Sequence, residues 1–288
     1  MPICHIVDDA LSNLLSIIAL KKSGDRSFLG QSSGHDEFGL FGGHQLAQGI
    51  AAAYQMVSKD RIMNSIHALF LRPGNGSQAI DYEVESIRDG RSFAQRRVRA
   101  MQEDRNIFEL TASFQSLESS ELIISPDFPE GVEAPELLPT FAECIERVGP
   151  IFGEEWSTSE RPVEYRIAHA PWAPTGPSGK GGIDFWFKAK RRLDDDAAVH
   201  AAVIAYMSDD CVSDTLLIPF NRTWGTEGTM CVSLDHSMWF HRPARADEWI
   251  YVEQWPSTAH GSRGLAHARM WQDGQLIASV AQEALLRF

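Results

Sequence analysis

Few side chains in this sequence form a pattern that identifies a chemistry by itself. Asp235, His236 and His241 lie close together, and these residue types bind metals, but the histidines lack i, i+4 spacing and no compact Cys/His cluster accompanies them. The GxSxG motif of serine hydrolases does not occur, so the sequence offers no serine nucleophile. We therefore expect no metal site, and we predict that His236 is a hydrogen-bonded strand residue.

The other candidates for chemistry are three aspartates, Asp209, Asp210 and Asp214, which follow a run of small and apolar residues. A carboxylate in such a place could accept a proton from water or from a substrate. An isolated aspartate at a helix end is more often a capping or turn residue. The residue types alone leave both interpretations open.

The composition excludes several classes of function. The chain has 288 residues, of which 43% are hydrophobic and 23% charged, as in globular proteins of about two domains. It carries 26 Lys and Arg against 39 Asp and Glu, and a net charge of -13 would repel a nucleic acid backbone. Its apolar runs are shorter than the roughly 20 residues that a membrane-spanning helix needs. The N-terminus is acidic, unlike a secretory signal, and the four cysteines are scattered, so we expect a cytoplasmic protein.

An internal repeat determines the expected architecture. The string HALFLRP begins at His67, and HSMWFHRP begins 169 residues later at His236, with one residue inserted before the shared Arg-Pro. Carried forward, the same offset gives three further pairs: Tyr82 with Tyr251, Met101 with Met270 and Asp104 with Asp273. We therefore expect a duplicated domain in which His67 and His236 occupy the same place.

Each half is expected to contain an antiparallel meander and one buried helix. Residues 80–87 alternate between apolar and polar types, which predicts a half-buried strand, and the Asp89-Gly90 pair predicts a hairpin turn. Residues 44–57 and 197–207 are rich in small residues on nearly every face, as in a helix held against a sheet. Residues 8–22 are predicted to form a short amphipathic helix.

A long antiparallel sheet wrapped around one central helix is the hotdog fold. Two copies in one chain make a double hotdog of the α+β class. We expect an N-terminal hotdog domain over residues 1–117, a proline-rich acidic connector over 118–159 and a C-terminal hotdog domain over 160–288.

Seven motifs together resemble the acyl-CoA thioesterase II family, the TesB-like double-hotdog enzymes. They lie in the family's order over roughly residues 28–287: FGGHQLAQGIAAA, HALFLRPG, RDGRSFAQRRV, ASFQ, AYMSD, SLDHSMWFHRP and SVAQEALLR. The resemblance implies hydrolysis of fatty acyl-CoA to a free acid and CoA, without a metal or an organic cofactor.

The resemblance also implies which residues hold the attacking water. In the family an aspartate, a hydroxyl residue and a glutamine bind it, and the motif positions place them on Asp209, Ser233 and Gln282. Many bacterial members have threonine where this chain has Ser233, which keeps the hydroxyl but lacks the methyl that restricts its rotamer. Asp209 is then the expected general base, and the N–H groups at Gly42-Gly43 are candidate oxyanion donors.

Two groups of basic residues could bind the phosphates of CoA. They are Arg91, Arg96, Arg97 and Arg99, and Lys188, Lys190, Arg191 and Arg192. The alternative is a set of solvated strand faces whose cations pair with the many acids. The sequence favours neither interpretation.

Two further functions stay open from the sequence. One is an acyl-binding protein that has lost turnover, although the three polar residues are retained. The other is a biosynthetic reaction, such as hydration or acyl transfer from a carrier protein, although the Asp/His motif of hotdog hydratases does not occur. The fold alone cannot decide between them. We also expect a homo-oligomer, because hotdog domains pair through their sheets and family members often assemble further.

Overall fold

The structure is a computed structural model that describes residues 9–32, 39–149, 160–176 and 178–288. Residues 1–8 of the expected first domain and 150–159 of the expected connector lie outside the described residues. No helix within the described ranges is long and apolar enough to cross a membrane.

Two central helices, one from each half, are accompanied by shorter helices. The α-helices are α1 (Ala10–Ile18), α2 (Gly42–Tyr54), α3 (Phe141–Val148) and α5 (Ala197–Ser208), and the 3-10 helices are η1 (Pro135–Leu137), η2 (Ser213–Leu216) and η3 (Ile218–Phe220). The predicted helix at 8–22 is shorter than expected. It begins after Asp9, whose side chain accepts the Ser12 N–H at 2.7 Å, and Lys21-Lys22 form a strand instead.

Each half contributes an antiparallel meander to the sheet. The strands of the N-terminal half are β1 (Lys21–Lys22), β2 (Ser27–Gly30), β3 (Arg61–Phe70), β4 (Ile80–Asp89), β5 (Phe93–Gln102) and β6 (Arg105–Ser116). Those of the C-terminal half are β7 (Val163–His169), β8 (Ile183–Ala189), β9 (Met230–Ser233), β10 (Asp235–Phe240), β11 (Ile250–His260), β12 (Arg263–Gln272) and β13 (Gln275–Arg287).

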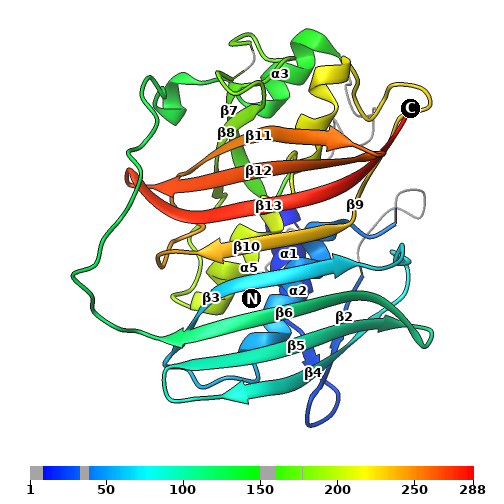
Figure 1. The fold of residues 1–288 in the computed structure, drawn as a ribbon, viewed down its shortest axis with the longest axis vertical. Coiled ribbons are helices and arrows are strands. Elements are labelled where there is room, and N and C mark those ends of the chain that lie inside the picture. Colours follow the sequence, from blue (N-terminus) through cyan, green and yellow to red (C-terminus); the bar gives the residue numbers. More distant parts are fainter. Residues whose placement is uncertain (1–8, 33–38, 150–159, 177) are drawn as a thin grey trace, which may run out of the picture.

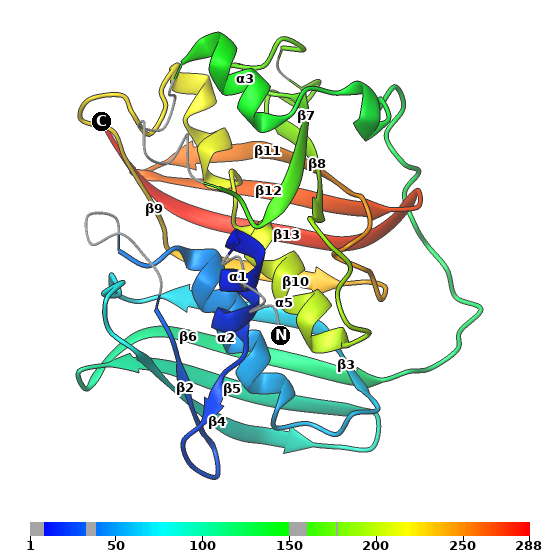
Figure 2. The same cartoon turned by 180° about the vertical axis from the view of Figure 1, so that it is seen from behind.

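The two meanders join edge to edge through β3 and β10 into one 13-stranded sheet (Figure 1). Its order is β1-β2-β4-β5-β6-β3-β10-β13-β12-β11-β8-β7, and β9 pairs with β13. Helices α2 and α5 lie in contact with each other on one face of this sheet (Figure 2). The architecture confirms the expected α+β double hotdog.

The central helices are apolar on most sides because the sheet and the partner helix surround them. Ile50 and Ala52 of α2 and Val203 and Ala205 of α5 have no exposed surface. Helix α2 starts two residues earlier than predicted, at Gly42, and ends earlier, at Tyr54. The chain then leaves the helix through tighter i to i+3 bonds, such as that from the Met56 N–H to the Ala53 carbonyl.

The segment between the halves runs along one side of the molecule and docks on the C-terminal half (Figure 1). Phe128 packs edge-on against Trp271, and the Trp186 indole donates to the Glu133 carbonyl at 3.2 Å. Helix α3 begins with a capping box between Thr140 and Glu143. The domain boundaries themselves stay a prediction.

The duplication has a structural counterpart, but its register is 170 residues rather than 169. Gln102 accepts from the backbone N–H of Asn75 at 2.8 Å and donates to its carbonyl at 2.9 Å. Gln272 makes the same pair of bonds with Arg245, at 2.9 and 2.8 Å. Gln272 lies 170 positions after Gln102, and Arg245 lies 170 positions after Asn75.

The difference of one residue reverses the face of every paired strand side chain. Tyr82 faces α2 and donates to Gln48 at 2.8 Å, whereas Tyr251 packs with Trp186 in a separate cluster outside the main core. The predicted pairing of Tyr82 with Tyr251, and with it Met101 with Met270 and Asp104 with Asp273, is therefore wrong.

The expectation that His67 and His236 occupy the same place is wrong for the same reason. His67 is exposed and lies 3.1 Å from the Ser237 hydroxyl, whereas His236 is fully buried. Ile66, not His67, lies 170 positions before His236.

Candidate active site

Asp209 lies where the two central helices meet. It is the C-cap of α5 and is 7% exposed. The backbone N–H of Gly43, in the first turn of α2, donates to its carboxylate. A carboxylate at a helix N-terminus is stabilised by the aligned peptide dipoles. Asp209 is therefore held between one helix from each half.

The glycine pair at the start of α2 permits this close approach. A methyl group added at Gly42 would lie 2.6 Å from Oδ2 of Asp209, and one added at Gly43 would lie 2.4 Å from the carbonyl oxygen of Tyr206. Both distances are shorter than non-bonded atoms tolerate. Only glycine therefore lets α2 reach Asp209 without moving α5.

Gln282 connects the other two predicted residues. It lies in β13 with no exposed surface, beside β9, where Ser233 pairs with Ala284. Its Nε2 donates to Oδ1 of Asp209 at 2.9 Å and to Oγ of Ser233 at 2.7 Å. The structure therefore brings Asp209, Ser233 and Gln282 together.

The environment of Asp209 changes its acidity. Burial raises the pKa of this carboxyl from 3.8 to about 6, and the nearby charge of Asp210 acts in the same direction. The hydrogen bonds from Gln282 and Gly43 oppose the increase because they favour the ionised form. At neutral pH the group is still mostly ionised, yet it is a stronger base than an ordinary aspartate.

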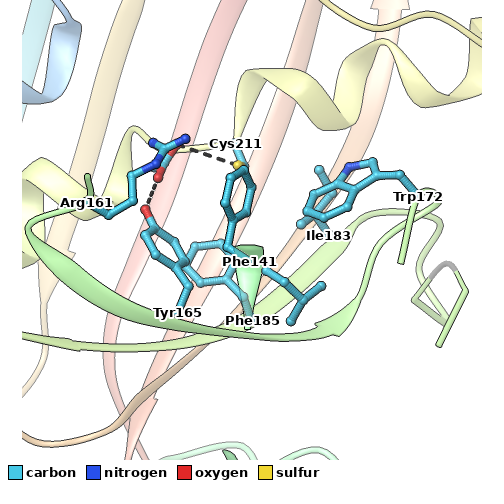
Figure 3. A pocket seen from close by; sticks show the side chains of 9 residues that line it. Phe141, Arg161, Tyr165, Trp172, Ile183, Phe185 and Cys211 are labelled. Carbon is cyan, nitrogen blue, oxygen red and sulfur yellow. Dashed lines mark hydrogen bonds between the residues drawn. The ribbon is translucent and has the colours of Figure 1, made fainter. Parts of the chain in front are cut away.

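Asp210, the next residue, is hydrogen-bonded to other partners. Its carboxylate accepts from the Tyr165 hydroxyl and, at 3.5 Å, from the Cys211 thiol. Tyr165, Cys211 and Phe141 line a cavity of about 10 Å³, which holds at most one water (Figure 3). This aromatic region is too small for a substrate, and of the two neighbouring aspartates Asp209 is the one bonded to Gln282.

Two family models match most of the chain. The C-terminal domain model of acyl-CoA thioesterases matches residues 133–286, and the N-terminal domain model matches residues 32–115. The chain belongs to the acyl-CoA thioesterase family.

Individual members of this thioesterase family are similar over nearly the whole chain. Acyl-CoA thioesterase 2 of Haemophilus influenzae is 34% identical over 286 residues, covering 98% of this chain and 99% of the relative. Acyl-coenzyme A thioesterase 8 of Mus musculus is 35% identical over 259 residues, covering 86% and 80%. The solved tesB protein of Mycobacterium avium subsp. paratuberculosis has a TM-score of 0.79 and 27% identity, covering 96% and 99%.

Among the described residues of this thioesterase, the positions of the N-terminal half that correspond to Ser233, His236 and Gln282 are apolar. Met63, Ile66 and Ala112 lie 170 positions before Ser233, His236 and Gln282, and each is at most 4% exposed. The strand pairing agrees, because Met63 lies opposite Phe114 as Ser233 lies opposite Ala284. The N-terminal half therefore has apolar side chains where the C-terminal half has its hydrogen-bonding network.

His236 is a hydrogen-bonded strand residue as predicted, but the sequence analysis did not predict that it is buried beside Gln282. One ring nitrogen, Nδ1, bonds to Oε1 of Gln282, and the other, Nε2, lies 2.9 Å from the Ser208 hydroxyl. Strand alternation could have indicated its burial, since His236 shares a face of β10 with Met238. The mistaken pairing with His67 hid this signal.

Seven of the eight residues in the two basic groups of this thioesterase contact acids or backbone carbonyls. Arg96 is 4% exposed and donates to three carbonyls and to Asp89. The remaining ion pairs in the two groups are Arg97 with Glu85 and Glu109, Arg99 with Glu83, Lys188 with Glu164, Lys190 with Glu160, Arg191 with Asp9 and Arg192 with Asp195. These contacts favour the interpretation as paired strand faces.

Two other expectations concern oxyanion donors and metals. The Gly43 N–H favours the ionised form of Asp209, and the oxyanion role of the Gly42 and Gly43 amides stays a prediction. Among the residues that the structure describes, no group of three or more His, Cys, Asp or Glu side chains is arranged to hold a metal ion.

Proposed function

We propose that the protein hydrolyses acyl-CoA thioesters to free acids and CoA with a water molecule activated by Asp209, Ser233 and Gln282. The observation that carries this proposal is the Gln282 amide, which bonds to both Asp209 and Ser233 at one buried corner. The family membership supports the substrate class. An acid near pKa 6 next to two hydrogen-bonding groups suits the removal of a proton from water.

The proposed reaction assigns each proton. The Ser233 hydroxyl accepts from Gln282, and within the described part of the chain it donates to no protein acceptor. It can therefore donate to a water whose own hydrogen points to Asp209. The water oxygen attacks the thioester carbonyl carbon as Asp209 takes its proton. The C–S bond then breaks, and the departing CoA thiolate receives that proton from Asp209.

The test is thiol release from a panel of acyl-CoAs of short to long chain, including branched and aromatic groups. We expect turnover to fall by about 100-fold or more in Asp209→Asn, in the range for a lost general base. Gln282→Ala and Ser233→Ala should fall by smaller factors. Ser237→Ala is the matched control, because Ser237 bonds to His67 on the exposed face. Release by Asp209→Asn at the wild-type rate would contradict the mechanism.

The alternatives predict different results in the same assay. Tight binding of acyl-CoA without release of thiol would indicate an acyl-binding protein, and release only from acyl carrier protein would indicate a carrier-linked substrate. The rates across the acyl-CoA panel measure which acyl chain lengths and types the protein prefers. The cytoplasmic location and the homo-oligomeric state stay predictions.

A further inference from the structure

We propose that His236 is a positioning residue that holds the Gln282 amide in one orientation throughout the reaction. The inference rests on the proposed function, because it concerns the groups that hold the attacking water. His236 lies in β10 with no exposed surface, and its Nδ1 is in a short hydrogen bond with Oε1 of Gln282. Gln282 then turns its NH2 group to Asp209 and Ser233.

The hydrogen-bond partners fix which ring nitrogen of His236 carries the proton. Oε1 of Gln282 can only accept, so Nδ1 must be the donor. Burial lowers the pKa of His236 to about 4, and the ring is neutral near pH 7. Nε2 is then an acceptor. It lies 2.9 Å from the Ser208 hydroxyl, which donates to the Ala205 carbonyl at 2.8 Å and can rotate to donate to Nε2 instead.

The charged groups around His236 do not reverse this assignment. Oδ1 of Asp209, at the end of α5, lies 3.9 Å from Nδ1, and Asp235 precedes His236 on β10. The charge of Asp235 and the bond to Gln282 favour the protonated ring, but burial has the larger effect. The hydrogen bonds therefore run in one direction from the Nδ1–H of His236 through Gln282 to Asp209.

This chain of bonds matters because Asp209 changes its protonation state during the proposed reaction. As an anion, Asp209 can only accept hydrogen bonds, so it keeps the NH2 group of Gln282 turned toward it without help from His236. Once it has taken the proton from water it can also donate, and a free amide could then turn Oε1 toward it. Such a turn would remove the bond to Ser233 and stabilise the protonated acid. The His236 Nδ1–H contacts Oε1 in both states and prevents the turn.

Two variants of His236 test the role. Leucine has a similar volume, and the buried Ile66 at the equivalent position of β3 indicates that an aliphatic side chain fits such a strand position. Asparagine places an amide N–H near the place of Nδ1 and can still donate. His67→Leu is the matched control, because His67 is exposed at the junction of β3 and β10.

We expect His236→Leu to lower kcat by about 10- to 100-fold with little change in KM, as for a misplaced catalytic group. The acid limb of its pH–rate profile should move to higher pH by about half a unit or more, because an amide oxygen that accepts from protonated Asp209 raises the pKa of that acid. His236→Asn should recover most of kcat and the wild-type acid limb. His67→Leu should behave as wild type.

The proposal is overturned if folded His236→Leu turns over at nearly the wild-type rate. It is also overturned if leucine and asparagine lose equal activity with an unmoved acid limb, since that pattern indicates only packing. Nitrogen NMR of the histidine-labelled wild type needs no variant. It should show protonated Nδ1 and bare Nε2 on His236 at pH 7, and the opposite tautomer or a doubly protonated ring would refute the role.

The same assay separates this inference from the proposed function. If Asp209→Asn hydrolyses acyl-CoA like the wild type, the water-activating set is wrong whatever His236 does. If Asp209→Asn is inactive while His236→Leu is unaffected, the function stands and only the role of His236 fails.

Discussion

Replacement of Asp209 by asparagine should make the protein less active but more stable. The pKa of Asp209 is raised from 3.8 to about 6, chiefly by burial. Each pKa unit corresponds to 1.36 kcal/mol, so the ionised group costs about 3 kcal/mol of folding free energy above pH 6. Asparagine has the same shape without the charge. The asparagine amide cannot accept well from both Gly43 and Gln282. This loss costs about 1–2 kcal/mol and offsets part of the stability gained by removing the charge.

The net expectation at pH 7.5 is a gain of about 1–2 kcal/mol in unfolding free energy, or a few degrees in Tm. The sign depends on pH. Between about pH 4 and 6 the folded protein holds a proton on Asp209 that the unfolded chain lacks, so the wild type gains stability from this group as the pH falls. At pH 4.5 the wild type should have recovered about 2 kcal/mol of unfolding free energy, so Asp209→Asn should no longer be the more stable protein.

Urea unfolding at pH 7.5 and pH 4.5 measures this difference, provided that the slope with denaturant is unchanged. Asp273→Asn is the control, because Asp273 is exposed in a left-handed turn at φ 51 that asparagine also adopts, and it should change neither property. If Asp209→Asn is destabilised equally at both pH values, Asp209 is not a desolvated carboxylate, and the account of its basicity fails.

Three further predictions follow from the same structure. In the wild type, kcat/KM should fall below an apparent pKa near 6, because protonated Asp209 cannot accept the proton of water; a profile flat to pH 5 would contradict this. Gly43→Ala should cost about 1–3 kcal/mol of stability and much of the activity, because its methyl meets the Tyr206 carbonyl at 2.4 Å. Gly24→Ala is the control: its methyl would meet Ser27 at an ordinary 3.5 Å, and it should be neutral in the same unfolding and turnover assays. Arg96→Met should cost about 2–4 kcal/mol by leaving three carbonyls without their donor, yet leave KM for acyl-CoA unchanged; a raised KM in a folded variant would instead place CoA at this side chain.

Much of the fold could be predicted because local patterns carry it. The alternation at residues 80–87 and the Asp89-Gly90 pair predicted the β4–β5 hairpin, although β4 continues to Asp89. The small residues of 197–207 gave α5 to within a residue, because a helix enclosed on all sides needs such side chains. The three site residues came from motifs rather than from spacing, and the structure places them in one hydrogen-bonded cluster.

The repeat shows where sequence reasoning stops. The similarity of the strings at His67 and His236 suggested an offset of 169, while the backbone bonds of Gln102 and Gln272 give 170. A strand side chain changes face with each residue, so an error of one exchanged the exposed His67 for the buried His236. No local signal could correct this, because the face of a strand is decided by what packs on it.

The sequence by itself predicted the double hotdog and offered Asp209, Ser233 and Gln282 as the residues to consider. These depend on residue types and motifs that stay the same whatever the chain contacts. The tertiary structure alone decided the pKa of Asp209, the orientation of the Gln282 amide and the place of His236 behind it. Each of these depends on burial and on hydrogen bonds between α2, α5, β9, β10 and β13, which are distant in the sequence and meet only when the two halves pack together.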